Sequence, residues 1–556
     1  MRISLYIITL LTLPIFLSAQ NNNGQINGDF NLNMQFYQDD ESIKADAPDE
    51  TILNNSYLNI VYTKGNFTLG VRYESYLNAL LGYDREYQGN DIIHRYATFN
   101  KDKLEVTTGN FYEQFGKGLT LRSYEDKGLG IDNSIDGIRV NYEPIDGFYI
   151  KSLIGKSRTY FEYSDGIIRG ADAEIHVNSL LNWNLKTDIR MGGSIVSRYQ
   201  KNEEIDYELP ENVSVYSGRM NIQYDNWDYY IEYANKINDP EGSGNYNYAE
   251  GNAMISNLTY SKRGFSVSLE GHRSDHFEFR SVRGTGNGRE YIINYLPTLG
   301  KQHTYSLLAL HPPATQIEGE FGYQIDVFYK IKKGSSIGGK YGTNIDLHYS
   351  KIMGLEAGPN GEISSYLDDY QEYTPAFMGD PENLYYSDIN ISVERKINKQ
   401  LKINTIAFSL QSYNRGVLEG DMTKYGRINS KIGVIDMTYK LNKQNAIRSE
   451  LQILLAEEEE FGDTRYLEGD WSMGLIEYTI NKEADWFFAI QDMYNWGNPD
   501  VEKQLHYLNI DIGYIKGANR FALGYGKKRQ GIFCVGGVCR TVPASNGFSL
   551  SISSNF

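Results

Sequence analysis

The sequence has few of the residues that build metal and catalytic centres. Only two cysteines and eight histidines occur among 556 residues. The cysteines, Cys534 and Cys539, stand in one Cys-Val-Gly-Gly-Val-Cys run, so no second pair can complete a four-cysteine metal site. In an exported protein, such a pair favours a disulfide that closes a small loop. The formal net charge of −17 disfavours a nucleic-acid partner.

Long apolar runs and linkers are also missing. Beyond the N-terminus no window has about 18 consecutive apolar residues, and the mean hydropathy is −0.49, which excludes membrane-spanning helices. Residues 1–20 have the pattern of a signal peptide: Arg2, an apolar core up to Leu17, and small residues before Gln20. The 13 prolines are scattered, so residues 21–556 are expected to form one continuous architecture rather than several soluble domains.

Tyrosine and glycine are the abundant residues, with 46 and 54 copies. Tyrosine suits a lipid interface, where its ring lies in the apolar layer and its hydroxyl in water, and glycine suits turns. On composition alone, a tyrosine-rich soluble sandwich remains an alternative.

The two ends of the mature chain alternate with the period of a β-strand. Residues 25–36 place apolar side chains at every second position, over a length close to that of a tilted membrane-crossing strand. The last strand alternates serine and asparagine with a set of apolar residues that we interpret as an insertion signal: Phe548, Leu550, Ile552 and Phe556. A closing strand that ends on an aromatic residue resembles the β-signal through which bacterial outer-membrane barrels engage their insertion machinery.

Between these first and last strands, tight turns alternate with long connections along the chain. Each tight turn includes the Gly, Asn or Asp that a hairpin needs. There are eleven: Lys64–Asn66, Asn100–Asp102, Pro144–Gly147, Asn182–Asn184, Asp225–Asn226, Lys262–Gly264, Lys332–Ser335, Asn398–Gln400, Asn442–Gln444, Asn481–Glu483 and Lys516–Asn519. Eleven hairpins with the first and last strands predict an all-β fold: one large antiparallel transmembrane β-barrel of about 24 strands (range about 22–26), with short periplasmic turns and long extracellular loops.

Two of the long connections are expected to fold into the lumen, at residues 111–136 and 274–319. The first is too apolar to project into water, and a barrel of about 24 strands has a wide bore to fill. Its candidate constriction residues are Phe111, Tyr112, Glu113, Phe115, Lys117 and Arg122. The charges of this loop are expected to pair with wall groups, for which we select Arg72, Glu74, Arg139 and Arg219.

Other motifs give no catalytic, metal or cofactor assignment, and the protein is predicted not to be an enzyme. Gly334-Ser335-Ser336-Ile337-Gly338 matches a nucleophile elbow, but it lies at a hairpin turn rather than between a strand and a helix. His303, His311, Glu318 and Glu320 lack metal-ligand spacing. Three arginines beside a glycine-rich run could bind phosphate or sugar acids, although a solvated loop is the simpler interpretation: Arg280, Arg283 and Arg289.

Three segments resemble a known family. They are Gly109–Leu119 with Leu129–Asn133, then Gln302–Tyr305 with Gly319–Glu320 and Gly338–Gly342, and finally Cys534–Ala544. Together they resemble an uncharacterised family of Bacteroidota outer-membrane β-barrel proteins, known as a domain of unknown function. The resemblance spans essentially the whole mature chain and implies a location and a barrel fold, with no activity and no site residues.

Two functions are consistent with this sequence. The first is an outer-membrane channel or passive transporter, because an energy-coupled receptor would have a large N-terminal plug whereas here a strand begins at Gln25. The alternative is a structural or accessory component of a cell-surface or secretion assembly. Expected partners are outer-membrane lipid, lipopolysaccharide and the barrel insertion machinery, with protein partners unknown and no cofactor.

Overall fold

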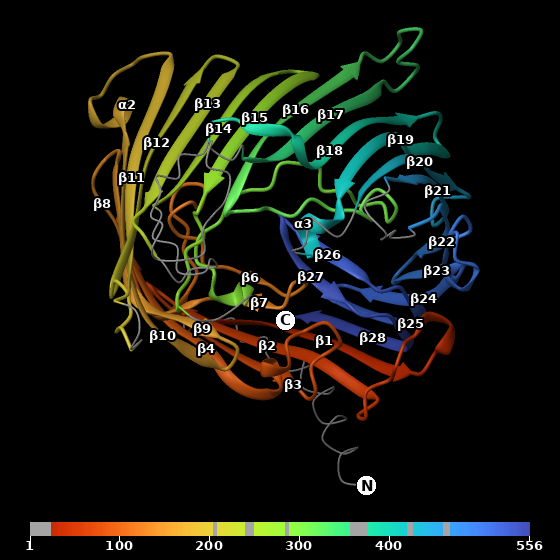
Figure 1. Ribbon diagram of the computed structural model, residues 1–556, viewed down its shortest axis with the longest axis horizontal. Helices are drawn as coiled ribbons and strands as arrows, with labels where there is room; N and C mark the ends of the chain where they lie inside the picture. Colours follow the sequence, from red (N-terminus) through yellow and green to blue (C-terminus); the bar gives the residue numbers. More distant parts are fainter. Residues whose placement is uncertain are drawn as a thin grey trace.

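The wall of the protein is a closed antiparallel sheet of 24 strands (Figure 1). We analysed a computed structural model that describes residues 24–203, 208–239, 250–283, 288–355, 376–419, 426–459 and 468–556. Each wall strand pairs with the next one along the chain, and the first, β1 (Gln25–Gln38), also pairs with the last, β28 (Ser545–Asn555). This pairing closes the ring. The predicted signal peptide, residues 1–20, lies outside the described residues.

Between these two strands the wall has 22 others. They are β2 (Ile52–Lys64), β3 (Phe67–Tyr76), β4 (Gly89–Lys101), β5 (Leu104–Phe111), β8 (Ile135–Ile145), β9 (Phe148–Thr159), β10 (Glu162–His176), β11 (Thr187–Tyr199), β12 (Asn212–Tyr224), β13 (Trp227–Lys236), β14 (Gly251–Lys262), β15 (Phe265–Asp275), β16 (Gly319–Ile331), β17 (Thr343–Leu355), β18 (Gly379–Lys396), β19 (Leu401–Asn414), β20 (Arg427–Lys440), β21 (Asn445–Glu458), β22 (Trp471–Asn481), β23 (Asp485–Tyr494), β24 (His506–Lys516) and β25 (Asn519–Lys528).

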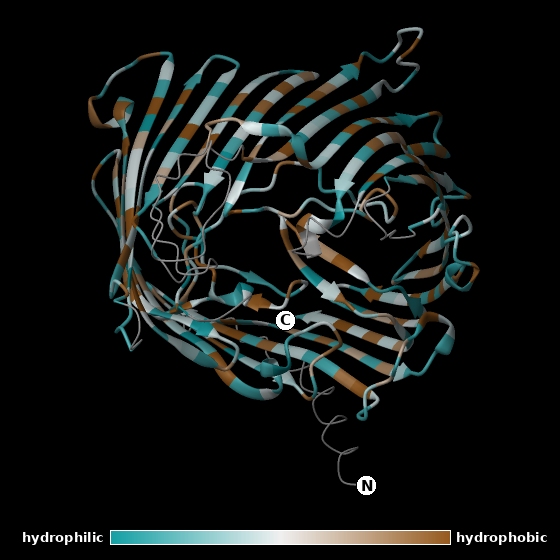
Figure 2. Cartoon of the chain, viewed as in Figure 1, coloured by the Kyte–Doolittle hydropathy of each residue, from teal (hydrophilic) through white to brown (hydrophobic). Residues whose placement is uncertain are grey.

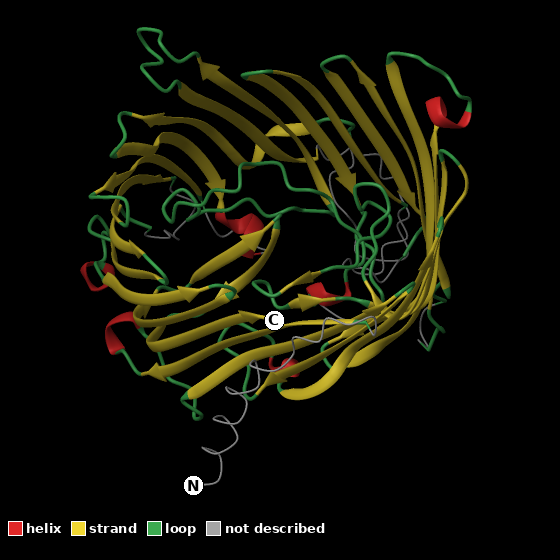
Figure 3. Cartoon of the chain, turned by 180° about the vertical axis from the view of Figure 1, so that it is seen from behind, coloured by secondary structure: helices red, strands yellow, loops and turns green. Residues whose placement is uncertain are grey.

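Short elements occupy the connections. They are η2 (Glu41–Ile43), η3 (Arg85–Tyr87), β6 (Glu125–Asp126), β7 (Ile131–Asp132), α2 (Val177–Leu180), η4 (Arg289–Tyr291), α3 (Arg415–Glu419), η5 (Val501–Lys503), β26 (Gly531–Val535) and β27 (Val538–Val542). Figure 3 shows the helical ones as short red segments. Among the described residues, no helix has the length and apolar character needed to cross a membrane.

The prediction of about 24 strands is confirmed, because each of the eleven predicted turns lies between two consecutive wall strands. The turn after β2 shows why glycine marks these turns. Gly65 has φ +56°, a conformation that glycine adopts without a steric penalty. Two of the turns are longer than predicted. The connection from β10 to β11 includes the helical turn α2, and the one from β16 to β17 covers residues 332–342.

The two faces of the wall differ in polarity, as the alternating bands in Figure 2 show. On the neighbouring strands β12 and β13, Tyr216 and Tyr233 face outward with exposed fractions of 48% and 51%. Arg219 and Glu232 are paired positions on the opposite, inward face. Because successive side chains point to opposite faces, one set of strands supplies both an apolar exterior and a polar interior.

The C-terminal residue completes the seam of the barrel. Phe556 and Gly28 exchange two backbone hydrogen bonds, of 2.8 and 2.9 Å. An ideal Cβ on Gly28 would lie 2.5 Å from the Phe556 ring, so the ring covers this glycine. Phe548 and Phe556 expose 46% and 44% of their surface. Their role as an insertion signal remains a prediction.

Candidate functional site

Three segments lie within the ring of strands, as Figures 1 and 3 show. We name them the first lumenal loop (residues 112–134, between β5 and β8), the second lumenal loop (residues 276–283 and 288–318, between β15 and β16) and the lumenal hairpin (residues 529–544, with β26 and β27). The first two correspond to the connections predicted to enter the lumen, with slightly narrower bounds. We treat the three segments as the candidate site, because they lie inside the ring of strands.

An apolar core attaches the first lumenal loop to the wall. Phe115, Leu119 and Leu121 are fully buried, although they lie in a connection between strands. They pack against inward-facing apolar residues of the wall: Leu153, Ile168, Val196, Val213, Val215, Ala234, Ala253 and Ile255. Burial of three such side chains stabilises the inward position by about 5–9 kcal/mol.

The tip of this loop sits on a buried wall carboxylate. The backbone N–H of Lys117 donates to Glu232 Oε2 at 2.8 Å, and Ser217 Oγ donates to Oε1 at 3.2 Å. Gly116 has φ +53°, and an ideal Cβ there would lie 2.5 Å from Glu232 Oε1. Only glycine therefore permits this close approach. The Lys117 side chain is exposed, with its Nζ 5.3 Å from the centre of the Tyr230 ring.

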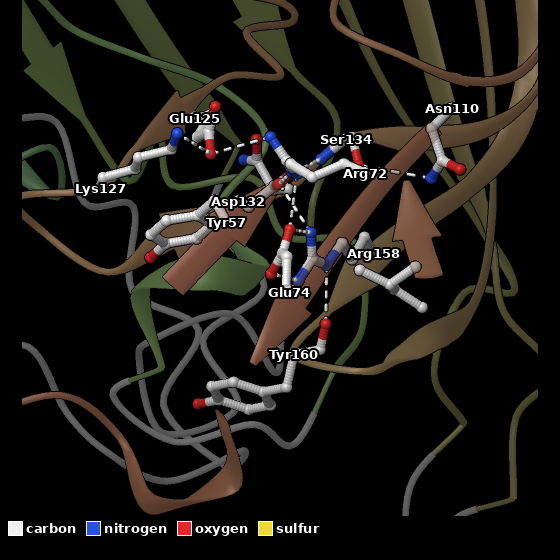
Figure 4. Close-up of polar contacts among 12 residues, drawn as sticks. Tyr57, Arg72, Glu74, Asn110, Glu125, Lys127, Asp132, Ser134, Arg158 and Tyr160 are labelled. Atoms are coloured by element: carbon white, nitrogen blue, oxygen red, sulfur yellow. Dashed lines mark hydrogen bonds and ion pairs between the residues drawn. The ribbon is translucent and has the colours of Figure 1, made fainter. Parts of the chain in front are cut away.

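A buried network of charges ties the same loop to two strands far apart in sequence (Figure 4). Arg158 of β9 donates to Glu74 of β3 at 2.7 and 2.8 Å, and to Asp132 of β7 at 2.7 Å. Arg72 of β3 forms ion pairs with Glu74 at 2.7 Å, with Glu125 at 2.9 Å and with Asp132. The exposed fractions of the Arg158 and Glu74 side chains are 0% and 2%. A network so deeply buried holds its members in one arrangement.

The pKa values of the two loop carboxylates are shifted in opposite directions. Burial alone would raise the pKa of Asp132, but the nearby guanidinium groups of Arg158 and Arg72 outweigh it, and the pKa is lowered. Burial raises the pKa of Glu125, because the attraction of Arg72 does not fully compensate. Asp132 is thus the anion on which the network is centred.

Three other predicted constriction residues lie where the loop leaves β5. Phe111 ends β5 and belongs to the apolar core, and the Tyr112 hydroxyl donates to Asp132 at 3.0 Å. Glu113 forms ion pairs with Arg139 at 3.5 Å and with Lys151 at 2.7 Å.

Of the four wall groups selected from the sequence, Arg72 and Arg139 pair directly with the loop. Glu74 reaches it through Arg158, which the sequence analysis missed. Arg219 was a wrong assignment, because it pairs with Asp172 and Glu174 of its own wall.

The second lumenal loop runs along a different part of the wall. His303 Nε2 lies 2.7 Å from Asp388 Oδ2 of β18, and Lys301 Nζ donates to Asn390 at 3.0 Å. Further along, the N–H of Leu307 donates to Gln452 of β21 at 2.9 Å. Leu307, Leu308 and Leu310 of the loop pack on buried apolar residues of strands β19 to β23: Ala407, Ile432, Val434, Leu454, Trp471, Met473 and Met493.

The three segments also bind one another. The first loop meets the second through two backbone hydrogen bonds, from Arg122 to Ile293 at 2.7 Å and from Tyr295 to Gly118 at 2.9 Å. The Tyr295 hydroxyl then donates to the carbonyl of Gly536, at the tip of the lumenal hairpin, at 3.0 Å.

The hairpin contacts the first loop as well, since Arg540 Nε donates to the carbonyl of Gly128 at 2.7 Å. Cys534 and Cys539 face each other across β26 and β27 and are joined by a disulfide. The sequence suggested the small loop but gave no sign that it lies inside the barrel.

The motifs set aside in the sequence form no catalytic arrangement. Ser335 Oγ donates to the Lys332 carbonyl within a turn. Glu320 pairs with His272, and His311 stacks on Tyr413, so the four metal-capable groups are dispersed. In the described ranges, no group of three or more His, Cys, Asp or Glu residues could hold a metal ion.

The chain matches, over residues 1–556, a family model described as "Family of unknown function (DUF6029)". It belongs to this family. No curated protein matches the chain.

Among solved structures, the chain is similar to the P pilus usher PapC translocation pore, with 10% identity, a TM-score of 0.41 and coverage of 96% of this chain and 99% of that chain. The ferric enterobactin receptor PfeA of Pseudomonas aeruginosa has 9% identity and a TM-score of 0.44, with 96% and 80% covered. The outer membrane protein OpdK of Pseudomonas aeruginosa has 10% identity and a TM-score of 0.33, with 78% and 96% covered. Values this low carry no information on function.

Proposed function

We propose that this family member is an outer-membrane channel or passive transporter whose lumen is narrowed by the three lumenal segments. The observation that carries the proposal is the closed 24-stranded sheet with an apolar outward face and a polar inward face. An apolar exterior of this extent is stable in a bilayer and not in water, and a closed sheet leaves no unpaired edge in lipid. The wall strands have 8 to 18 residues, against about 9–11 needed to cross.

The orientation and the remaining partners belong to the same proposal. The rim with the short turns faces the periplasm, which places both termini there, and the rim with the long connections faces outward. The signal peptide over residues 1–20 directs export, and the outer face contacts outer-membrane lipid and lipopolysaccharide. The origin in Bacteroidota is implied by the sequence resemblance alone.

The proposal includes no reaction. A serine, a histidine and an aspartate do meet where the second lumenal loop contacts the wall, but their bonding differs from that of an activated nucleophile. Ser409 Oγ donates to Asp388, and the same carboxylate holds His303. A nucleophile needs its hydroxyl bonded to the base rather than to the acid, so this cluster supports anchoring of the loop.

Planar bilayers test the proposal. Purified protein should give stepwise currents, and a variant in which a short Gly-Ser linker replaces residues 112–134 should give larger steps. The matched control replaces residues 39–50, a connection on the same rim in which most residues are exposed, although Ile43 and Ala45 are buried. A protein that never conducts, yet copurifies with the same proteins from native membranes, would instead support the accessory role in a surface or secretion assembly.

A further inference from the structure

Three arginines lie near one another where the three lumenal segments touch, since the charge of Arg540 acts on Arg289, and the charges of Arg122 and Arg289 both act on Tyr124. Arg122 comes from the first loop, Arg289 from the second and Arg540 from the lumenal hairpin. We name them the arginine junction. None of the three forms an ion pair with a carboxylate in the described part of the chain. Most other inward arginines do form such pairs: Arg72, Arg139, Arg158, Arg198 and Arg219.

Aromatic rings cover the faces of two of these guanidinium groups. The Arg122 Cζ lies 3.8 Å from the centre of the Tyr295 ring and 4.3 Å from that of Tyr124. The Arg540 Cζ lies 4.3 Å from the centre of the Tyr83 ring. Stacking uses the faces of a guanidinium, whereas its N–H groups point outward in its plane, so stacking leaves them available for an acceptor.

Unsatisfied donors are present at the junction. The Nη1 of Arg540 is buried without a hydrogen-bond partner. Arg289 is half-buried, and burial together with the charge of Arg540 lowers its pKa, despite the opposite influence of Asp84 and Glu290. A guanidinium whose pKa is lowered is one whose charge its surroundings do not balance.

The nearest carboxylates are bonded to other groups. Asp126 Oδ1 accepts the N–H of Leu129 at 2.9 Å. The Tyr160 hydroxyl lies 2.6 Å from Glu290 Oε1 and 3.3 Å from Asp84 Oδ2. These acids moderate the local charge without occupying the guanidinium edges.

We propose that the arginine junction binds the oxyanion of a small solute, a carboxylate or a phosphate, within the lumen. Guanidinium groups match the geometry of both anions through pairs of parallel hydrogen bonds. An anion between these arginines would be attracted by charges from all three lumenal segments. The inference deepens the proposed function, because it names the class of solute that the channel would recognise.

Titration calorimetry on the full chain in detergent tests the site, with glucuronate and glucose 6-phosphate as probes and glucose as the uncharged control. Glucuronate and glucose 6-phosphate should bind, more weakly as salt is added, and glucose should not. The decisive variant is Arg289→Gln, because Arg122 also joins two loops by stacking. It should weaken binding of both anions about tenfold, the loss of one charge-assisted contact, and Arg289→Lys less.

The matched control is Arg190→Gln, since Arg190 lies on β11 and is already paired with Asp188 at 3.2 Å. It should bind both anions as the wild type does. Equal heats for glucose and glucuronate, or unchanged affinity in Arg289→Gln, would overturn the inference. Binding in detergent requires no conductance, so anion binding by a protein that fails to conduct would reject the channel and retain the site.

Discussion

Asp132→Asn should loosen the first lumenal loop, because Asp132 is the carboxylate shared by Arg72 and Arg158. Removal of one partner from a buried ion pair typically costs about 3–5 kcal/mol. The population with the loop displaced should therefore rise by roughly 100-fold to several thousand-fold. The apolar core still contributes about 5–9 kcal/mol, so most molecules should keep the loop in place.

A second substitution should remove a large part of that reserve. Phe115 is fully buried, and Phe115→Ala should reduce the stability of the inward position by a further ~3–5 kcal/mol. The double variant Asp132→Asn/Phe115→Ala should then expose the loop in many more molecules than either single variant does. The assay is trypsin cleavage at Lys117 and Arg122 in intact cells, with uptake of a bulky antibiotic measured in parallel.

The control for this experiment is Asp188→Asn. Asp188 pairs with Arg190 at 3.2 Å, but both side chains are about two-fifths exposed, so the loss should be at most about 1 kcal/mol. Cleavage in the control should match the wild type. If the double variant also resists trypsin and excludes the antibiotic, the network does not hold the loop, and the reasoning is refuted.

Three further predictions concern the seam, the disulfide and pH. Deletion of Phe556, or Gly28→Val, which would collide with its ring, should abolish heat-modifiable barrel in the outer membrane while export continues; normal accumulation would contradict the seam account. Double serine replacement of Cys534 and Cys539 should leave the barrel folded at a loss of roughly 2 kcal/mol, and thiol labelling of native protein should find neither residue free. Because the pKa of Asp132 is lowered, its stabilisation is complete above the unfolded pKa near about 4 and is lost as pH falls through the lower folded pKa; conductance of Phe115→Ala, in which the apolar core is weakened, should stay constant from about pH 8 to about pH 5 and rise only below about pH 4, and a rise in the higher range would argue against this network.

The wall could be predicted from the sequence because its signals are local. A turn such as that at Gly65 and the alternation on either side of it fix a hairpin without reference to the rest of the chain. The inward position of the first loop followed from a similar argument, since residues such as Phe115 are too apolar for an exposed connection.

The interior could not be predicted to the same extent, because its contacts join positions far apart in the chain. Arg158 and Glu74 are 84 residues apart, and Tyr295 and Gly536 are 241 apart. No periodicity marks such pairs. Arg219 shows the same limit: its charge and inward position were evident, but strand register decided that its partner is Asp172 rather than the loop.

Conductance of the wild type and of the variant lacking residues 112–134 tests the central claim most directly. The account predicts stepwise currents in both proteins, with larger steps in the variant and unchanged steps in the control lacking residues 39–50. Folded, heat-modifiable protein that gives no steps in either form would contradict a channel narrowed by its own lumenal segments.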